Sequence, residues 1–361
     1  MTCLGSGVYS ATVRVVGTGA FVEEIIREDI LSGTWNRTLS STSTCTLSIG
    51  LTGNVAEKCC KYIELAKGIP AYELYLWREN NGDGANELVW KGPITELSLQ
   101  PGNVVTLTAK DCSWWLSKRR FDTRTFGPAD INTVAQAMAD YGYGLNNPPN
   151  VVTRSALAGV TGEKSFTDAD GSRVLDNITD MVRGLSYWTC VLNDFRIGLN
   201  CTVPITISDG DVAELPPLVW SADDFSTEVF GRTSNAAFAV AGGVSAARFG
   251  IPLLVTNIID ANTTTNVDAL TFATQRLADM SNPGAAMEAS NSSLTPSFDI
   301  GINELIPGCR IKTNFDGYCE PDPRLLWISG VEGSFNSSDE DIRLSLSNTV
   351  GDSADNRVSS V

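Results

Sequence analysis

The sequence predicts a β-rich α+β protein in which two small antiparallel β-barrels flank two inserted α/β domains. Strand-like alternation of apolar and polar residues fills both ends of the chain, and helical spacing appears only in its middle. The two ends also share a tryptophan-centred strand pattern. A chain of 361 residues exceeds what one core holds, so several domains are expected. We expect a first barrel at 1–116, a first α/β domain at 117–205, a connecting segment at 206–228, a second α/β domain at 229–292, a second barrel at 293–348 and a flexible tail at 349–361.

The N-terminal strands form an antiparallel meander in this interpretation. Cys45, Leu47 and Ile49 alternate with polar residues, and the aromatic-rich run Tyr72–Trp77 is followed by the turn residues NNGDGAN and the partner strand LVWKGPITELS. A second turn at 101–103 precedes another alternating run. The length of this meander suits a small closed barrel.

The pair Gly92-Pro93 lies inside one of these strands. Proline gives no ladder hydrogen bond, and glycine has no side chain to pack. The apolar positions change parity between Ile94 and Leu97, which predicts a bulge or bend at this place. The pair is therefore interpreted as the point where the strand turns a barrel corner.

Helical spacing marks the middle of the chain. Residues 130–144, with Asp130 as N-cap, and residues 172–185 each place apolar side chains on one face, and 187–199 predicts a hairpin. A second mixed unit is expected from strands at 236–244 and 251–259. Its helix spans 268–280, with Asp268 as the cap and with an apolar stripe at Leu270, Ala273, Leu277 and Met280.

The C-terminal strands echo the N-terminal ones. LLWISGVEGSF, at 325–335, resembles LVWKGPITELS in its tryptophan, glycine and β-branched order. The next alternating run begins at the same distance, since Trp90 to Val105 and Trp327 to Ile342 both span 15 positions (105 − 90 and 342 − 327). This predicts two related β units, with two unrelated sheets as the alternative.

Composition excludes several classes of chemistry. The chain has no histidine, which removes Ser-His-Asp and Cys-His nucleophiles and most catalytic zinc sites. A net charge of −16 gives no general attraction for nucleic acid. No apolar run reaches about 20 residues, so no membrane span is predicted, and MTCLGSGVYS does not resemble a secretory signal.

Nine cysteines without a CxxC pair favour buried thiols in a cytoplasmic protein over a disulfide framework.

Possible sites have ordinary structural alternatives. Asp168-Ala-Asp170-Gly171 begins like a calcium loop, but Ser172 and Thr179 stand where further ligands are needed, so helix capping by an Asp or Ser is preferred. Asn81-Gly-Asp-Gly84 is a hairpin turn. The acidic groups Asp223-Asp224 and Asp339-Glu-Asp341 show no marked catalytic pair.

Aromatic, basic and glycine-rich motifs are equally open. Trp114-Trp115 suits sugar stacking or a core position, and Lys118-Arg119-Arg120 suits a basic patch or a solvated segment between domains. Gly5-Ser-Gly7 and Ala241-Gly-Gly243 lack the setting of a phosphate loop. We therefore predict no catalytic, cofactor-binding or metal-binding residue.

Several segments together resemble the hub proteins of long phage tails, most closely the minor tail proteins of siphophages that infect actinobacteria. They are Trp35-Asn-Arg-Thr-Leu39, Tyr72–Trp77, Val89-Trp-Lys-Gly-Pro-Ile94, Leu107-Thr-Ala-Lys-Asp111, Trp114-Trp-Leu-Ser-Lys-Arg119, 172–199, and the passage from Asn282-Pro283 to Leu305-Ile-Pro-Gly308. The likeness covers nearly the whole chain by layout.

The resemblance implies a structural and non-enzymatic role in the virion. Family hubs are homotrimers in which two barrels per chain give a pseudo-sixfold ring. Such a ring lies against the hexameric distal tail protein, surrounds the C-terminal region of the tape measure protein, and contacts downstream tip or fibre proteins. Phage DNA passes through the channel without lasting contact, and acidic channel walls would suit that passage. Assembly takes place in the host cytoplasm.

Two other functions remain open at this point. A receptor- or glycan-binding tail protein would use exposed aromatic side chains, and a histidine-free cell-wall hydrolase would use paired carboxylates. Contractile-tail and secretion-system hubs share the general layout, although a chain of this size favours a non-contractile tail.

Overall fold

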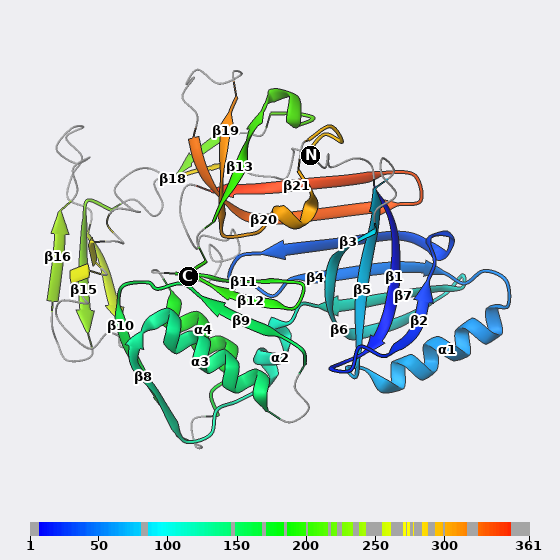
Figure 1. The fold of residues 1–361 in the computed structure, drawn as a ribbon, viewed down its shortest axis with the longest axis horizontal. Coiled ribbons are helices and arrows are strands. Elements are labelled where there is room, and N and C mark those ends of the chain that lie inside the picture. Colours follow the sequence, from blue (N-terminus) through cyan, green and yellow to red (C-terminus); the bar gives the residue numbers. More distant parts are fainter. Residues whose placement is uncertain are drawn as a thin grey trace.

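A computed structural model of the chain (Figure 1) provides the description that follows. The described residues are 7–80, 86–145, 149–167, 171–183, 186–199, 201–215, 218–221, 226–233, 238–242, 255–260, 270, 271, 273, 274, 277, 284–287, 293–298, 300–315 and 324–347.

One large sheet holds strands from both ends of the chain. The order is β14-β18-β21-β20-β3-β4-β7-β6-β5-β1-β2, with β19 beside β20 and β13 beside β19. These strands are β1 (Gly7–Val15), β2 (Phe21–Ile25), β3 (Ile30–Thr38), β4 (Thr44–Gly50), β5 (Tyr72–Asn80), β6 (Asn86–Gln100), β7 (Val104–Lys110), β13 (Cys201–Ser208), β14 (Leu218–Ser221), β18 (Gly284–Met287), β19 (Cys309–Asn314), β20 (Arg324–Asn336) and β21 (Glu340–Ser347). The alternation predicted from the sequence is confirmed, because Leu47, Val105 and Leu107 all point into the core.

The two ends of the sheet repeat one order of strands. Neighbouring strands run β1-β5-β6-β7-β4-β3 in the N-terminal half and β13-β19-β20-β21-β18-β14 in the C-terminal half, and the matching strands follow one another in the same order along the chain. β20 ends 236 residues after β6 (336 − 100), and β21 begins 236 residues after β7 (340 − 104). The tryptophan echo therefore marks two β units of like topology.

The halves share one sheet and do not form two separate barrels. β3 pairs with β4 on one side and with β20 on the other, so its second edge joins the two halves. Among the described strands of this sheet β2, β13 and β14 remain as edges, and no pairing closes a barrel. The β-rich α+β class is confirmed, whereas the expected closed barrels are not found in this part of the chain.

The Gly92 position confirms the predicted bend. β6 pairs with β5 up to Pro93 and with β7 from Ile94, and the register with β7 shifts just after that point. A Cβ at Gly92 would overlap the carbonyl oxygen of Lys110. Glycine is therefore needed because two backbones approach each other where the strand changes partners.

One helix in the N-terminal region was not predicted. The region predicted to be strands contains α1 (Val55–Gly68). Asn54 is its N-cap, and the Asn54 side chain accepts a hydrogen bond from the amide of Glu57. Tyr62 and Leu65 bury one face of α1, while Lys58 and Lys61 pair with Asp29 and Glu23. Such a short amphipathic run between strands is easily mistaken for more strand.

An α/β unit is inserted between β7 and β13. It contains α2 (Ser113–Lys118), β8 (Arg124–Asp130), α3 (Ile131–Gly144), β9 (Val152–Ser155), β10 (Thr161–Phe166), α4 (Val174–Val182), β11 (Trp188–Val191) and β12 (Asp194–Ile197). The two predicted helices and the hairpin are confirmed, and the Asp130 side chain caps α3 through the amide of Asn132. The predicted capping by Asp or Ser fails at α4, because Arg173 occupies its N-cap without a side-chain bond.

A small sheet lies apart from the large one (Figure 1). It orders its strands β16-β15-β17, with bounds β15 (Glu228–Thr233), β16 (Phe238–Gly242) and β17 (Val255–Asp260). In the predicted helix 268–280, Ala273 and Leu277 are helical and buried, whereas Leu270 is 48% exposed. The predicted cap, Asp268, and the last residue of the predicted apolar stripe, Met280, lie outside the described residues. The predicted domain limits and the flexible tail remain predictions.

The cysteine prediction needs one correction. Cys201 and Cys309 form a disulfide between parallel strands β13 and β19, with their Cα atoms 4.5 Å apart. Their separation of 108 positions hides this pairing in the sequence. Cys45, Cys112 and Cys190 are buried, as predicted, and Cys60 is exposed.

Three short 3-10 helices complete the described elements: η1 (Arg27–Asp29), η3 (Asp209–Asp211) and η5 (Ile302–Glu304). Within the described ranges, every helix is too short or too polar to cross a membrane.

Candidate functional site: a polar clamp between the ends of the chain

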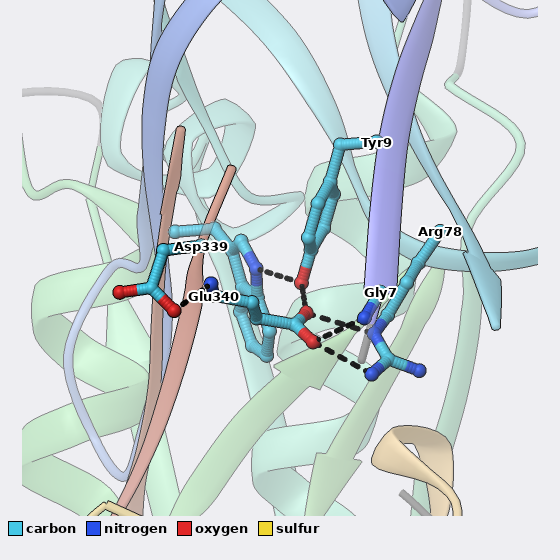
Figure 2. Close-up of polar contacts among 6 residues, drawn as sticks. Gly7, Tyr9, Arg78, Asp339 and Glu340 are labelled. Atoms are coloured by element: carbon cyan, nitrogen blue, oxygen red, sulfur yellow. Dashed lines mark hydrogen bonds and ion pairs between the residues drawn. The ribbon is translucent and has the colours of Figure 1, made fainter. Parts of the chain in front are cut away.

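The first and last strands of the described chain meet at one carboxylate. Glu340 opens β21, and its side chain reaches β1 and β5, where Tyr9 and Arg78 are cross-strand partners. Figure 2 shows Gly7, Tyr9 and Arg78 all directed at this carboxylate. We call these four residues the terminal clamp.

The carboxylate of Glu340 is fully engaged. Its Oε2 accepts from the Gly7 amide and from Arg78 Nη2, both at 2.7 Å, and its Oε1 accepts from Arg78 Nε at 2.8 Å and from the Tyr9 hydroxyl. The two arginine contacts make a bidentate pair, which fixes direction as well as distance. Trp35 Nε1 donates to the Tyr9 hydroxyl oxygen at 3.4 Å.

Burial makes the clamp sensitive to loss of a partner. The side chains of Arg78 and Glu340 are 2% and 5% exposed. Burial would lower the pKa of Arg78, but hydrogen bonding and attraction to Glu340 raise it overall. Burial, and then the charge of Glu340, raise the pKa of Tyr9. The clamp is therefore a charged pair around a neutral phenol, within packed strands.

A second buried cation links the same halves. Arg37, on β3, donates to the carbonyl of Ile302 at 3.1 Å, to Asn303 Oδ1 at 2.7 Å and to the carbonyl of Val89. Asn303 in turn donates to the Leu88 carbonyl at 3.1 Å. Burial lowers the pKa of Arg37 to about 10. Its guanidinium thus ties η5 of the C-terminal half to β3 and β6.

The chemistry of this region is structural. Two hollows flank the clamp, one of about 250 Å³ with Thr34, Asn36 and Glu332 in its lining and one of about 200 Å³ with Tyr9, Arg27 and Asp339. In the described part of the chain, no group of three or more Asp, Glu or Cys residues is placed to hold a metal ion. Because its carboxylate already has four donors, the clamp holds strands together and presents no open group to a substrate.

The acidic motifs separate in the structure. Of Asp339-Glu-Asp341, Glu340 belongs to the clamp, Asp341 pairs with Arg343 at 2.6 Å, and Asp339 accepts from the Glu340 amide. Asp223-Asp224, Asp168, Asp170 and the Asn81–Gly84 turn lie outside the described residues. Both glycine motifs are only partly described.

The aromatic and basic motifs lie at the entry to the inserted unit. Trp114 and Trp115 are half-buried on α2 and contact each other edge to face, with centroids 5.1 Å apart. Lys118 lies over Trp114, and Arg119 lies over Trp115 and donates to the Gly142 carbonyl. Both open interpretations of these motifs remain untested.

Sequence reasoning missed the clamp and Arg37. The sequence does hold a signal for these buried charges. In a strand, every second side chain points to the same face, so Arg78 points inward with Leu74 and Leu76, and Arg37 points inward with Trp35. A charged residue at an inward strand position predicts a buried partner, but parity does not reveal which distant residue supplies it.

Comparison with known proteins gives structural neighbours only. No protein-family model and no curated protein sequence matches the chain. The tail protein from Neisseria meningitidis MC58 superposes with a TM-score of 0.61 at 11% identity, over 94% of this chain and 96% of that one. The 43 kDa tail protein of prophage MuSo2 from Shewanella oneidensis gives 0.59 at 11% identity, over 93% and 97%. Prophage tail protein gp18 from Listeria monocytogenes EGD-e gives 0.57 at 10% identity, over 95% of each chain.

A further solved structure shares the fold. In the Francisella PdpA-VgrG complex the likeness has a TM-score of 0.56 at 8% identity and covers 98% of this chain but 55% of that chain. The resemblance to phage tail hubs seen in the sequence is thus confirmed at the level of fold: this chain has, over nearly its whole length, the fold of phage tail proteins.

Proposed function

We propose that this chain is a structural hub at the tip of a long non-contractile phage tail, where three copies form a ring that adapts sixfold tail symmetry to threefold tip symmetry. The observation that carries the proposal is the near full-length likeness to three phage tail proteins, each covered by at least 95% of its own length. Coverage of this extent fits a complete shared architecture better than one borrowed domain.

The repeated topology supports the symmetry argument. Each chain carries two β units with the same strand order, so three chains present six such units around an axis. The halves also differ, since β1 is antiparallel to β5 whereas β13 is parallel to β19. Around a ring of three chains, the two kinds of β unit would alternate. Six units with the same strand order but two alternating forms suit a ring with sixfold character on one face and threefold character on the other.

The terminal clamp supports a rigid ring. The pairing of β3 with β20 joins the halves by backbone hydrogen bonds, and the clamp and Arg37 add side-chain bonds across the same junction. In a ring of this kind the angle between the two halves sets the spacing of the six units, so a fixed junction favours closure.

The proposal includes partners and location. The ring would contact the hexameric distal tail protein, the C-terminal region of the tape measure protein and downstream tip or fibre proteins, in a virion assembled in the host cytoplasm. DNA would pass through without lasting contact, in keeping with the net charge of −16. The chain would have no enzymatic role.

Mass and shape of the purified protein test this function. Light scattering after size exclusion should give three times the chain mass of 38.6 kDa, and negative-stain images should show a threefold ring with a central hole. A monomer at every concentration, with no ring, would contradict the hub. A monomer that binds cell-wall glycans would support the receptor-binding alternative, and clearing of peptidoglycan by the chain would support the hydrolase.

A further inference from the structure

Two further cysteines approach each other where the inserted α/β unit begins. Cys112 is the N-cap of α2, two residues after β7 ends, and Cys190 lies in β11. Their Sγ atoms are 2.9 Å apart. Unbonded carbon atoms pack at roughly 3.5–4.0 Å and sulfur atoms are larger, whereas a disulfide has an S–S distance of about 2.05 Å. The two sulfur atoms are thus nearer than packed thiols and within about 1 Å of bonding distance.

The surroundings hold both residues in this place. Asp111 precedes Cys112, and its carboxylate accepts from the amides of Ser43 at 2.7 Å and Ser113 at 2.9 Å. The Tyr143 hydroxyl donates to the Cys112 carbonyl at 3.1 Å. On the other side, the Trp188 carbonyl, two residues before Cys190, accepts at 2.8 Å from the amide of Ser40, which lies in the connection between β3 and β4. Little movement would therefore be needed to bring the sulfur atoms into bonding distance.

We propose that Cys112 and Cys190 form a second disulfide, so that both passages of the chain between the large sheet and the inserted unit are cross-linked. The entry is at Cys112, and the exit is at Cys201, which is already bonded to Cys309. Tyr187 lies at the exit, with its hydroxyl 2.7 Å from the carbonyl of Gly308, the neighbour of Cys309. The two cross-links would restrain the chain where it enters and where it leaves the inserted unit, whether or not the chain forms a tail hub.

The chemistry is thiol–disulfide exchange with a small-molecule disulfide. One cysteine thiolate attacks a sulfur of that disulfide and expels the first small thiolate, and the other cysteine thiolate then attacks the mixed disulfide and expels the second. Two electrons pass to the small molecule, and the two protons from the cysteines end on the released thiols. Both cysteines are buried, and burial raises the pKa of the Cys190 thiol. Formation and reduction in the folded protein should therefore be slow, because thiolate and access are both scarce.

Peptide mapping of the full chain tests the proposal. The purified protein is incubated with glutathione disulfide, unfolded in denaturant with an alkylating agent, digested without reductant and analysed by mass spectrometry. The Cys201–Cys309 peptide serves as the internal positive control. The expected result is a linked peptide pair containing Cys112 and Cys190, which disappears after reduction in denaturant. Alkylation of both Cys112 and Cys190 while Cys201–Cys309 remains linked would overturn the proposal, as would linkage of either residue to another cysteine.

Thermal unfolding gives an independent measurement. For each protein, we compare the Tm of the oxidised form with the Tm of the fully reduced form. This difference should be about 5 °C larger in the wild type than in the Cys112→Ala/Cys190→Ala variant. Cys45→Ala is the matched control, because Cys45 is a buried thiol of the large sheet with no sulfur partner among the described residues. The difference in Tm between oxidised and reduced forms should be the same in this control as in the wild type. An equal difference in all three proteins would also refute the second cross-link.

Discussion

Replacing Glu340 by Gln should destabilise the protein far more than the same change at an exposed ion pair. The carboxylate is 5% exposed and accepts from four donors, two of them on Arg78, whose side chain is 2% exposed. The substitution removes the charge and turns one acceptor into a donor. Arg78, a buried cation, then loses the carboxylate that forms a bidentate pair with it.

The expected cost follows from that loss. Removing one partner of a buried ion pair costs about 3–5 kcal/mol, and glutamine keeps one acceptor, so a loss of about 3 kcal/mol in the free energy of unfolding is expected. Urea denaturation followed by tryptophan fluorescence measures it. Glu64→Gln is the control, because Glu64 pairs with Lys67 on the exposed face of α1 and should change stability by less than about 1 kcal/mol.

A double substitution separates charge loss from packing loss. Glu340→Leu/Arg78→Met removes both members of the bidentate pair, and an apolar replacement of a buried pair is often tolerated. The double variant should therefore be more stable than Glu340→Leu alone. Two results would contradict this account of the clamp. One is a loss in the free energy of unfolding for Glu340→Gln that is no larger than for Glu64→Gln. The other is a loss for the double variant that equals the sum of the losses for its two single substitutions.

Three further outcomes are expected. Gly92→Ala should lower the free energy of unfolding by about 1–3 kcal/mol because its Cβ overlaps a neighbouring backbone carbonyl, whereas Gly144→Ala, with open space around it, should be nearly neutral in the same urea titration. Tyr9→Phe should cost about 1–2 kcal/mol, since it removes the bond from the hydroxyl to Glu340 and the bond that the hydroxyl accepts from Trp35 Nε1, and a cost above that of Glu340→Gln would contradict this ranking. Burial opposes ionisation of Asp29, but hydrogen bonds from Lys58 and Thr52 lower its pKa below 3.8. The difference in the free energy of unfolding between wild type and Asp29→Asn should therefore be largest at pH 7 and shrink as the pH falls through that lowered pKa. A difference that grows on acidification would refute the assignment.

Local patterns in the sequence predicted local structure well. Period-two alternation located β4 and β7, and the parity change near Gly92 located the bend in β6. The Trp90 and Trp327 echo predicted a repeated topology that the strand order bears out. Each of these signals lies within one strand or one hairpin, where side-chain direction follows directly from position.

The remaining features depend on pairing between distant segments. Nothing near Thr38 shows that β3 would pair with β20, so the sequence suggested two closed barrels where the described strands form one sheet. Cys201 and Cys309 meet only because β13 and β19 run parallel in register. Arg78 signals a buried charge by its parity, but Glu340 lies 262 residues away.

The pairing of β3 with β20 changes how the proposed ring would keep its symmetry. Two separate barrels on a linker would let the spacing of the six units vary, whereas one sheet fixes the second half relative to the first by a continuous ladder from Thr38↔Gly330 to Ser32↔Asn336. Two buried networks add side-chain bonds between the halves: Glu340 pairs with Arg78, and Arg37 donates to Asn303. In a trimer, variation in spacing can therefore arise only at contacts between chains. Loosening of such a ring should therefore change the spacing between β units of neighbouring chains and leave the spacing of the two β units within each chain unchanged.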